Sequence, residues 1–180
     1  MPPRSRARDF VWGRKLGQGS FGAAFEVVRI ANDRTYVIKQ CHIGRMSQDE
    51  QEDAIREVHL LASLQHEYIV KYHDSFITPG TPGTLNIVME SCCGGDLSSL
   101  VQDCRRRGKR LAESRIWRYF LQLGAALSYI HSRKILHRDL KTANVFVVRN
   151  GDVRLGDFGV SKVSEKPGQH PSPPMSCWCS

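Results

Sequence analysis

The chain has 180 residues, of which 41% are hydrophobic and 24% charged, and its net charge is +8. These proportions are ordinary for a globular protein, and the length suits one domain or two small lobes that share a cleft. No apolar run approaches the roughly 18 residues of a membrane span, and the basic N-terminus lacks the apolar stretch of a secretory signal. We therefore expect no membrane partner and an intracellular location, cytoplasmic or nuclear.

The positive charge is concentrated in two clusters, at residues 4–8 and 105–110. Such clusters can bind nucleic acid or another anion, or act as a nuclear-import signal. Neither cluster is interleaved with aromatic side chains on which bases could stack. We therefore favour a solvated helix end and a flexible N-terminus over residues 1–9, and we do not expect nucleic acid as a partner.

Residues 10–90 predict a β-rich half that contains one helix. Runs of β-branched and aromatic residues, bounded by turn residues, indicate strands. The expected strands cover 10–12, 24–28, 35–39, 69–76 and 85–90. Between the third and fourth strands the pattern changes to helical spacing over 48–65, where Ile55, Val58 and Ala62 fall on one stripe.

A glycine pair at 94–95 interrupts the strand pattern, and the chain is mostly helical after it. The strongest helix is expected over 112–133, because its apolar residues recur at intervals of three and four. That stripe consists of Ile116, Phe120, Leu123, Leu127 and Ile130. Residues 135–155 indicate short strands and loops, and the proline-rich composition of 164–180 predicts a disordered tail. The predicted fold class is α+β, with a β-rich upper half, a hinge and a helical lower half.

A glycine-rich motif, Gly17-Gln18-Gly19-Ser20-Phe21-Gly22, lies between two predicted strands. On its own, this pattern fits a dinucleotide-binding fold or a flexible turn. A dinucleotide site needs a helix directly after the glycines, whereas a strand is expected here. A strand–loop–strand hairpin instead suits a flap over phosphates, because glycines let the backbone approach the phosphate oxygens.

Lys39 ends the third predicted strand, where its ammonium group could pair with phosphate oxygens. Glu57 lies in the following predicted helix and could be the anionic partner of the lysine. Each residue alone is better explained as an ordinary surface side chain, and Glu50, Glu52 and Asp53 are also available on the helix. Periodicity by itself does not select Glu57.

The clearest chemistry is carried by His137-Arg138-Asp139-Leu140-Lys141-Thr142-Ala143-Asn144 and by Asp157-Phe158-Gly159. Asp139 is the candidate general base, or the group that orients a hydroxyl nucleophile. Lys141 can neutralise charge that develops on a transferred phosphoryl group. Asn144 and Asp157 offer the hard oxygen ligands that Mg²⁺ prefers. A lone Asp or Asn more often forms a local hydrogen bond, but the complete string indicates phosphoryl transfer from ATP.

Taken in order, the glycine motif, the strand lysine, the helix glutamate, HRDLKxxN and DFG resemble a eukaryotic protein kinase. The pair Leu140-Lys141 resembles the serine/threonine branch of that family. Segments 69–76, 87–90, 93–97 and 155–162 are similar to the NIMA-related kinases. The resemblance covers residues 10–163 and implies a two-lobed kinase fold. Its parts would be the N-lobe at 10–90, the hinge at 90–95 and a partial C-lobe at 96–163.

The resemblance also implies roles for individual residues. Lys39 would hold the phosphates of ATP and pair with Glu57, and Asp139 would be the catalytic aspartate, with Lys141 beside it. Asn144 and Asp157 would bind Mg²⁺. The flap over the nucleotide would consist of Leu16, Gly17, Gln18, Gly19, Ser20, Phe21, Gly22, Ala23 and Ala24. The adenine and ribose would be contacted by Ala24, Val37, Met89, Glu90, Cys92, Asp96 and Phe146. Leu61 would stack with Phe158 and His137.

The sequence departs from the kinase pattern after DFG, because neither an APE motif nor the later C-lobe helices follow. We therefore expect a C-terminally truncated kinase domain in which apolar residues of the 112–133 helix lack packing partners. One hypothesis is a serine/threonine kinase that uses Mg-ATP and protein substrates. The alternative is a non-catalytic binding or regulatory fragment that retains the ATP site.

Overall fold

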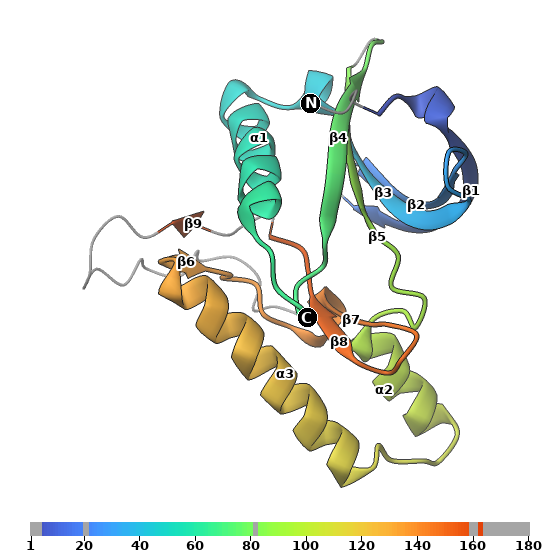
Figure 1. Cartoon of the computed structure of the whole chain (residues 1–180), viewed down its shortest axis with the longest axis vertical. Coiled ribbons are helices and arrows are strands. Elements are labelled where there is room, and N and C mark those ends of the chain that lie inside the picture. The colour runs from blue at the N-terminus through green and yellow to red at the C-terminus, as the bar shows by residue number, and fades with distance from the viewer. Residues whose placement is uncertain (1–4, 20–21, 81–82, 159–161, 164–180) are drawn as a thin grey trace.

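The computed structural model describes residues 5–19, 22–80, 83–158 and 162–163, and it has two parts (Figure 1). The upper part is a five-stranded sheet with one helix, α1 (Gln48–Ser63), beside it. The lower part contains α2 (Leu97–Arg106), α3 (Glu113–Ser132) and two small β-ribbons. The expected two-lobed α+β architecture is confirmed. Within the described ranges, no helix is both long and apolar enough to cross a membrane.

The sheet is antiparallel, and its strands follow the order β1-β2-β3-β5-β4. The strands are β1 (Phe10–Gly19), β2 (Gly22–Arg29), β3 (Arg34–Cys41), β4 (Tyr72–Thr78) and β5 (Thr84–Glu90). Because β3 is central, Lys39 is flanked by Ala24 on β2 and Ile87 on β5. Hydrogen bonds to two neighbouring strands fix the backbone of this lysine.

The first strand is longer than the sequence predicts. β1 continues to Gly19, with irregular register between Trp12 and Gly17, so the first glycines of the motif lie in a distorted strand. Gly22 already belongs to β2 and pairs with Cys41. A Cβ atom at Gly22 would lie 1.8 Å from the carbonyl oxygen of Gln40, so the close approach of β2 to β3 requires glycine here.

Helix α1 begins with a capping box. The Ser47 Oγ accepts a hydrogen bond from the Glu50 backbone N–H, and the Glu50 carboxylate accepts one from the Ser47 N–H, which satisfies two amides at the helix start. Val58 and Leu61 are buried in the core. Ile55 and Ala62, which we expected on the buried stripe, are exposed instead, because the face containing Val58 and Leu61 is the one that meets the core.

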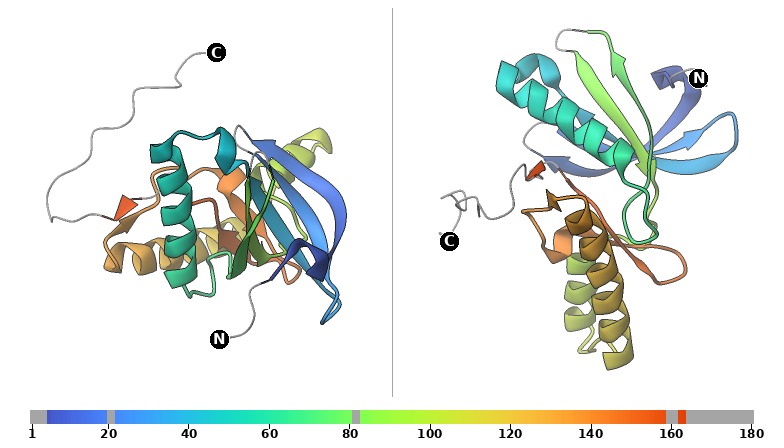
Figure 2. Two further views of the ribbon diagram at one scale, coloured as in Figure 1. Left: turned by 90° about the horizontal axis from the view of Figure 1, so that it is seen from above. Right: turned by 60° about the vertical axis from the view of Figure 1, so that its left-hand side comes forward.

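In the lower part, α2 and α3 lie side by side and extend away from the sheet (Figure 2). Between α3 and the end of the described chain come β6 (Ile135–Leu136), a 3-10 turn η3 (Thr142–Asn144), β7 (Val145–Val147), β8 (Val153–Leu155) and β9 (Lys162–Val163). β6 pairs with β9, and β7 pairs with β8. These short ribbons carry the segments that hold Asp139 and Asp157.

The two parts are joined through β8. The Leu155 N–H donates to the Tyr68 carbonyl at 2.8 Å, and the Val70 N–H donates to the Leu155 carbonyl at 2.9 Å. One buried cluster contains side chains from both parts, among them Ile87 of the sheet and Ile130 of α3. The loop before β4 and the β7–β8 ribbon therefore form one continuous core with the sheet.

The buried face of α3 differs from the predicted stripe. Its buried residues are Tyr119, Gln122, Ala126 and Ile130. Leu123 and Leu127 are partly buried. Ile116, Trp117, Phe120 and Leu121 are 52%, 57%, 65% and 68% exposed. Apolar side chains therefore extend beyond the face of α3 that packs against the rest of the described chain.

A polar network fixes α3 against the β7–β8 ribbon. The buried Asp152 carboxylate accepts hydrogen bonds from Arg118 at 2.6 Å and from Gln122, while the Gln122 Oε1 accepts from the Val153 N–H at 3.0 Å. Asn150 donates to the second carboxylate oxygen at 2.6 Å. Burial alone would raise the pKa of Asp152, but hydrogen bonds from the three side chains hold it below the ordinary value.

The residues before β1 also differ from expectation. We expected a flexible terminus over 1–9, but Ser5 is 8% exposed and its N–H donates to the Asp74 carboxylate at 2.7 Å. The segment from Ser5 onward is therefore hydrogen-bonded to the sheet.

The Gly22→Ala variant should be destabilised, because its Cβ would collide with the β3 backbone. Overpacking of this kind costs about 1–3 kcal/mol, which corresponds to a Tm decrease of roughly 2–12 °C in a domain of this size. Gly17→Ala is the matched control, since a Cβ there would meet no heavy atom of the described residues within 4 Å. Thermal melts without nucleotide would contradict this account if the two variants had equal Tm values.

The Asp152→Asn variant should lose about 1.5–3 kcal/mol of unfolding free energy at pH 7, because charge-assisted hydrogen bonds to a buried carboxylate are broken. The folded-state pKa lies below the unfolded value of about 3.9, so this stabilisation is complete above about pH 5, declines as pH falls through the unfolded pKa, and is lost below the folded-state pKa. Urea unfolding between pH 7 and pH 3.5 measures the difference. The exposed Asp49→Asn is the control, and a difference that did not shrink in acid would contradict the assignment.

Candidate active site

The loop between β6 and η3 brings three polar side chains together. The Lys141 Nζ lies 2.8 Å from the Asp139 Oδ2. The Asn144 Nδ2 donates to the same oxygen at 2.9 Å and to the Asp139 backbone carbonyl at 2.8 Å. The sequence placed these three residues in one motif, and the fold turns their side chains toward one another.

The charge state of this cluster follows from these contacts. The hydrogen bond from Lys141 is the main reason why the pKa of Asp139 lies below its ordinary value; burial opposes the shift and Asn144 supports it. The same hydrogen bond raises the pKa of Lys141. At neutral pH the pair is therefore a carboxylate beside an ammonium group. A carboxylate stabilised in this way is a weak base but a good hydrogen-bond acceptor for a hydroxyl group.

A second segment, at the end of β8, points its carboxylate toward the sheet. The Asp157 Oδ1 lies 3.1 Å from the Lys39 Nζ, although the two residues are 118 positions apart. Both side chains are partly exposed, so the pair is accessible to a ligand. This ion pair connects the central strand of the upper part with the lower part.

The backbone around Asp157 is held in an uncommon conformation. Asp157 has φ 56° and Arg138 has φ 67°, values that residues other than glycine rarely adopt. The His137 ring nitrogen Nε2 forms a hydrogen bond with the Gly156 carbonyl at 2.9 Å, and its ring lies 4.8 Å from that of Phe158. Phe158 is 1% exposed. These buried contacts on either side of Asp157 maintain its conformation.

Asn144 and Asp157 have the chemistry to hold Mg²⁺. The Asn144 amide nitrogen is already used by Asp139, which leaves its Oδ1 as the atom that could coordinate a cation. Asp157 supplies a carboxylate that is partly open to solvent. Mg²⁺ typically takes one or two protein oxygens together with water and substrate phosphates, so this small donor set fits it. In the described part of the chain, no cluster of three or more acidic, His or Cys side chains offers another metal site.

Several residues expected around the adenine occupy neighbouring positions on the strands. Val37 pairs with Met89 across β3 and β5, and Ala24 is next to Lys39 on β2. From below, Phe146 on β7 forms an isolated bridge with Asp96. Leu16 projects from β1 and is half-exposed. The sheet and β7 therefore bring these apolar side chains to the junction of the two parts.

Asp96 has a second use that the sequence did not indicate. Its carboxylate accepts from the Ser99 N–H at 2.8 Å and from the Ser99 hydroxyl at 2.7 Å, so it caps the start of α2. The cap engages both carboxylate oxygens. A contact of Asp96 with a ribose stays a prediction.

Several expected site residues cannot be compared with the structure. Ser20, Phe21 and Gly159 lie outside the described residues, as does the tail over 164–180. Gly19 ends β1, and the backbone of Glu57 lies in α1, but the Glu57 side chain is not described. The pairing of Glu57 with Lys39 therefore stays a prediction. Leu61 lies in the same buried cluster as Phe158, as the resemblance implied.

Sequence reasoning missed Arg154. Its Nε lies 3.2 Å from the Glu90 Oε1, and Glu90 also accepts from the Lys71 N–H at 2.7 Å. This pair links β8 to the end of β5, where the hinge begins. The period-two pattern of β8 contained a signal, because Arg154 alternates with the buried Val153 and Leu155. Nearby, burial and the Glu90 charge raise the pKa of the Cys92 thiol to about 12, so Cys92 is neutral.

The protein kinase domain family matches residues 10–178. Serine/threonine-protein kinase Nek1 of Mus musculus is 43% identical over 150 residues, which are 83% of this chain and 12% of that protein. Probable serine/threonine-protein kinase nek2 of Dictyostelium discoideum is 41% identical over 151 residues, 82% of this chain and 36% of that protein.

Serine/threonine-protein kinase Nek6 of Oryza sativa subsp. japonica is 36% identical over 149 residues, 83% of this chain and 27% of that protein. The chain thus spans between 12% and 36% of the length of these three relatives. The similarity extends across both parts of the fold and includes the segments that carry Lys39, Asp139 and Asp157. The chain therefore belongs to the protein kinase family, within the NIMA-related serine/threonine group that these relatives represent.

Proposed function

We propose that this chain transfers the γ-phosphoryl group of ATP to serine or threonine hydroxyls of proteins. The observation that carries the proposal is the geometry around Asp139, whose carboxylate is bound by Lys141 at 2.8 Å and Asn144 at 2.9 Å. Phosphoryl transfer depends on positioning the hydroxyl and on neutralising phosphate charge, and it requires little covalent chemistry from the protein.

Asp139 orients the incoming hydroxyl by accepting its hydrogen bond, and it takes the proton late in the reaction. Lys141 is placed to stabilise negative charge on the transferred group, because its ammonium lies beside the same carboxylate oxygen. The hydrogen bond from Lys141 holds the pKa of Asp139 below its ordinary value, so the carboxylate is ionised at neutral pH and its protonation should not limit activity there.

Lys39 binds the phosphates of ATP from the centre of the sheet, and its contact with Asp157 keeps the ammonium at the junction of the two parts. Ala24, Val37, Met89 and Phe146 would contact the adenine, as the kinase resemblance implies. Asn144 and Asp157 would hold Mg²⁺, which would supply positive charge to neutralise the phosphates. As the kinase resemblance implies, Glu57 would pair with Lys39, and residues 16–24 would cover the phosphates.

A second candidate is a binding or regulatory fragment that keeps the ATP site but does not catalyse. The exposed apolar face of α3 favours it, because Phe120 and Leu121 are 65% and 68% exposed. Each large apolar side chain left in water forgoes about 1.5–3 kcal/mol of stabilisation, which is a considerable part of the ~5–15 kcal/mol that stabilises a domain.

Kinase assays of the full chain with Mg-ATP and a serine/threonine peptide library separate the two candidates. Asp139→Asn should lower kcat about 10²–10⁴-fold, because the positioned hydrogen-bond acceptor is lost. Lys39→Met should lower both turnover and ATP affinity. Matched controls are Asp49→Asn and Lys109→Met, which change exposed residues outside the site and should have wild-type rates.

Binding is measured separately by thermal shift with Mg-ATP. A ligand at 100 times its Kd stabilises the folded state by about 2.7 kcal/mol, and Lys39→Met should remove this shift. If ATP raises the Tm but the wild type turns over no faster than Asp139→Asn, the binding fragment is correct. If neither a shift nor turnover occurs in a cooperatively folded chain, both candidates are wrong.

A further inference from the structure

The residues before β1 contact two strands of the sheet, β4 and β2. The Ser5 N–H donates to the Asp74 carboxylate on β4 at 2.7 Å, and Arg29 on β2 donates to the Ser5 hydroxyl at 2.7 Å. A 3-10 turn, η1 (Ala7–Asp9), follows, and the Asp9 carbonyl accepts from the Ile30 N–H at 3.0 Å. The segment Ser5–Asp9 is therefore attached to two strands, and we call it the N-terminal clasp.

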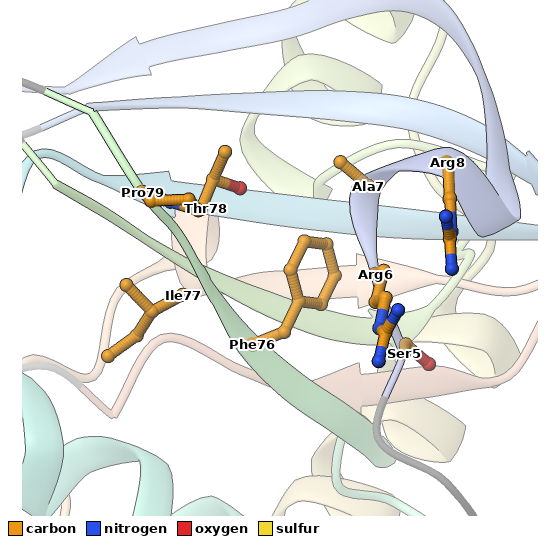
Figure 3. A pocket seen from close by; sticks show the side chains of 8 residues that line it. All are labelled: Ser5, Arg6, Ala7, Arg8, Phe76, Ile77, Thr78 and Pro79. Carbon is orange, nitrogen blue, oxygen red and sulfur yellow. The ribbon is translucent and has the colours of Figure 1, made fainter.

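A cavity of about 400 Å³ lies between the N-terminal clasp and the second half of β4 (Figure 3). Arg6, Ala7 and Arg8 of the clasp form one wall, and Ile77, Thr78 and Pro79 form the other. Its volume is within the range of roughly 300–1,000 Å³ that is usual for ligand sites. The cavity is lined by none of the residues assigned above to ATP or Mg²⁺, so it is a separate site.

The clasp wall is positively charged. The Arg6 and Arg8 guanidinium groups both belong to this wall, and neither forms an ion pair with a carboxylate in the described part of the chain. The nearby Asp74 carboxylate accepts hydrogen bonds from the backbone N–H groups of Ser5 and Ser75. Two unpaired guanidinium groups favour a ligand with carboxylates, which they can bind through paired hydrogen bonds.

The β4 wall adds an apolar surface and a strand edge. β4 is the last strand of the sheet, so one of its edges is not paired with another strand of that sheet. Ile77 on this strand is 62% exposed. An extended peptide can add to such an edge through backbone hydrogen bonds, with alternate side chains facing the strand's own apolar residues.

We propose that this cavity is a docking site for an extended, acidic segment of a partner protein. Its carboxylates would bind Arg6 and Arg8, an apolar side chain would contact Ile77, and its backbone would pair with β4. A nucleic acid fits less well, because the aromatic residue of the wall, Phe76, is buried and stacked on Phe10 with 6.1 Å between ring centroids. It cannot stack with a base. This docking site goes beyond the proposed kinase activity and does not depend on it.

Fluorescence anisotropy of the full chain tests the proposal with a labelled nine-residue peptide that alternates glutamate and valine. The peptide should bind, and higher salt should weaken binding. The double variant Arg6→Ala/Arg8→Ala and the single variant Ile77→Asp should each raise Kd at least tenfold. Arg107→Ala/Arg110→Ala removes the same charge from an exposed, distant region and should change Kd less than twofold.

Three further probes identify the ligand class. A lysine–valine peptide should not bind, and a glutamate–valine peptide N-methylated at alternate residues should bind at least tenfold more weakly, because it cannot donate to the β4 backbone. A single-stranded oligonucleotide of equal charge should not compete. The proposal is overturned if the oligonucleotide binds as tightly and depends on the same arginines. It is equally overturned if the acidic peptide does not bind. The same holds if the peptide has equal Kd values for the Arg6→Ala/Arg8→Ala variant and for the Arg107→Ala/Arg110→Ala control. Circular dichroism and thermal melts check that each variant is folded.

Discussion

The burial of Phe158 beneath the sheet is the contact on which the arrangement of the site depends. Phe158 is 1% exposed, and full burial of such a side chain contributes about 1.5–3 kcal/mol. His137 stacks near its ring and bonds to the Gly156 carbonyl, so the residues on both sides of Asp157 are anchored. Asp157 is thereby held at φ 56° with its carboxylate at Lys39. Core packing of Phe158, together with the His137 hydrogen bond, therefore orients the residue proposed to bind the metal.

Two lysine–carboxylate pairs set the charge distribution around the candidate active site. Lys39 and Lys141 each lie beside a carboxylate, at 3.1 Å and 2.8 Å. Because these pairs are partly exposed, each contributes little to stability; in the proposed function their ammonium groups would face the phosphates. Arg154 and Glu90 form a more buried pair at the hinge. Two of the Arg154 nitrogens, Nε and Nη1, have no hydrogen-bond partner among the described residues, so the cost of desolvating them offsets the attraction between Arg154 and Glu90.

The exposed face of α3 and the cavity under the N-terminal clasp are features of different kinds. The α3 face is broad and apolar, and nothing in the described chain covers it. The cavity is smaller and combines charge, an apolar contact and a strand edge, which together specify a ligand class. The exposed α3 face affects the stability of the chain as an independent domain. The cavity concerns ligand binding by the upper part, and this binding does not require catalysis at the candidate active site.

Much of the fold and site could be predicted from the sequence. The order of strands and helices, the glycine motif, and the proximity of Asp139, Lys141 and Asn144 follow from local patterns, because residues within one loop are brought together by their spacing. Helix starts are equally local, as the Ser47–Glu50 capping box illustrates. The sequence did not predict which face of each helix is buried, because a wide apolar stripe is compatible with several orientations toward the core.

Only the tertiary structure decided those points. It turned Ile55 and Phe120 outward, placed Arg154 against Glu90, and tied Ser5 to Asp74 across the sheet. The two contacts join residues that are distant in sequence. The exposure of Ile55 and Phe120 depends on which helix face packs against the core, and this depends on the whole chain. The sequence by itself determined which reaction these residues belong to, because a catalytic loop is a local string. Which side chains support that loop depends on packing between elements, and packing is known only when the chain is folded.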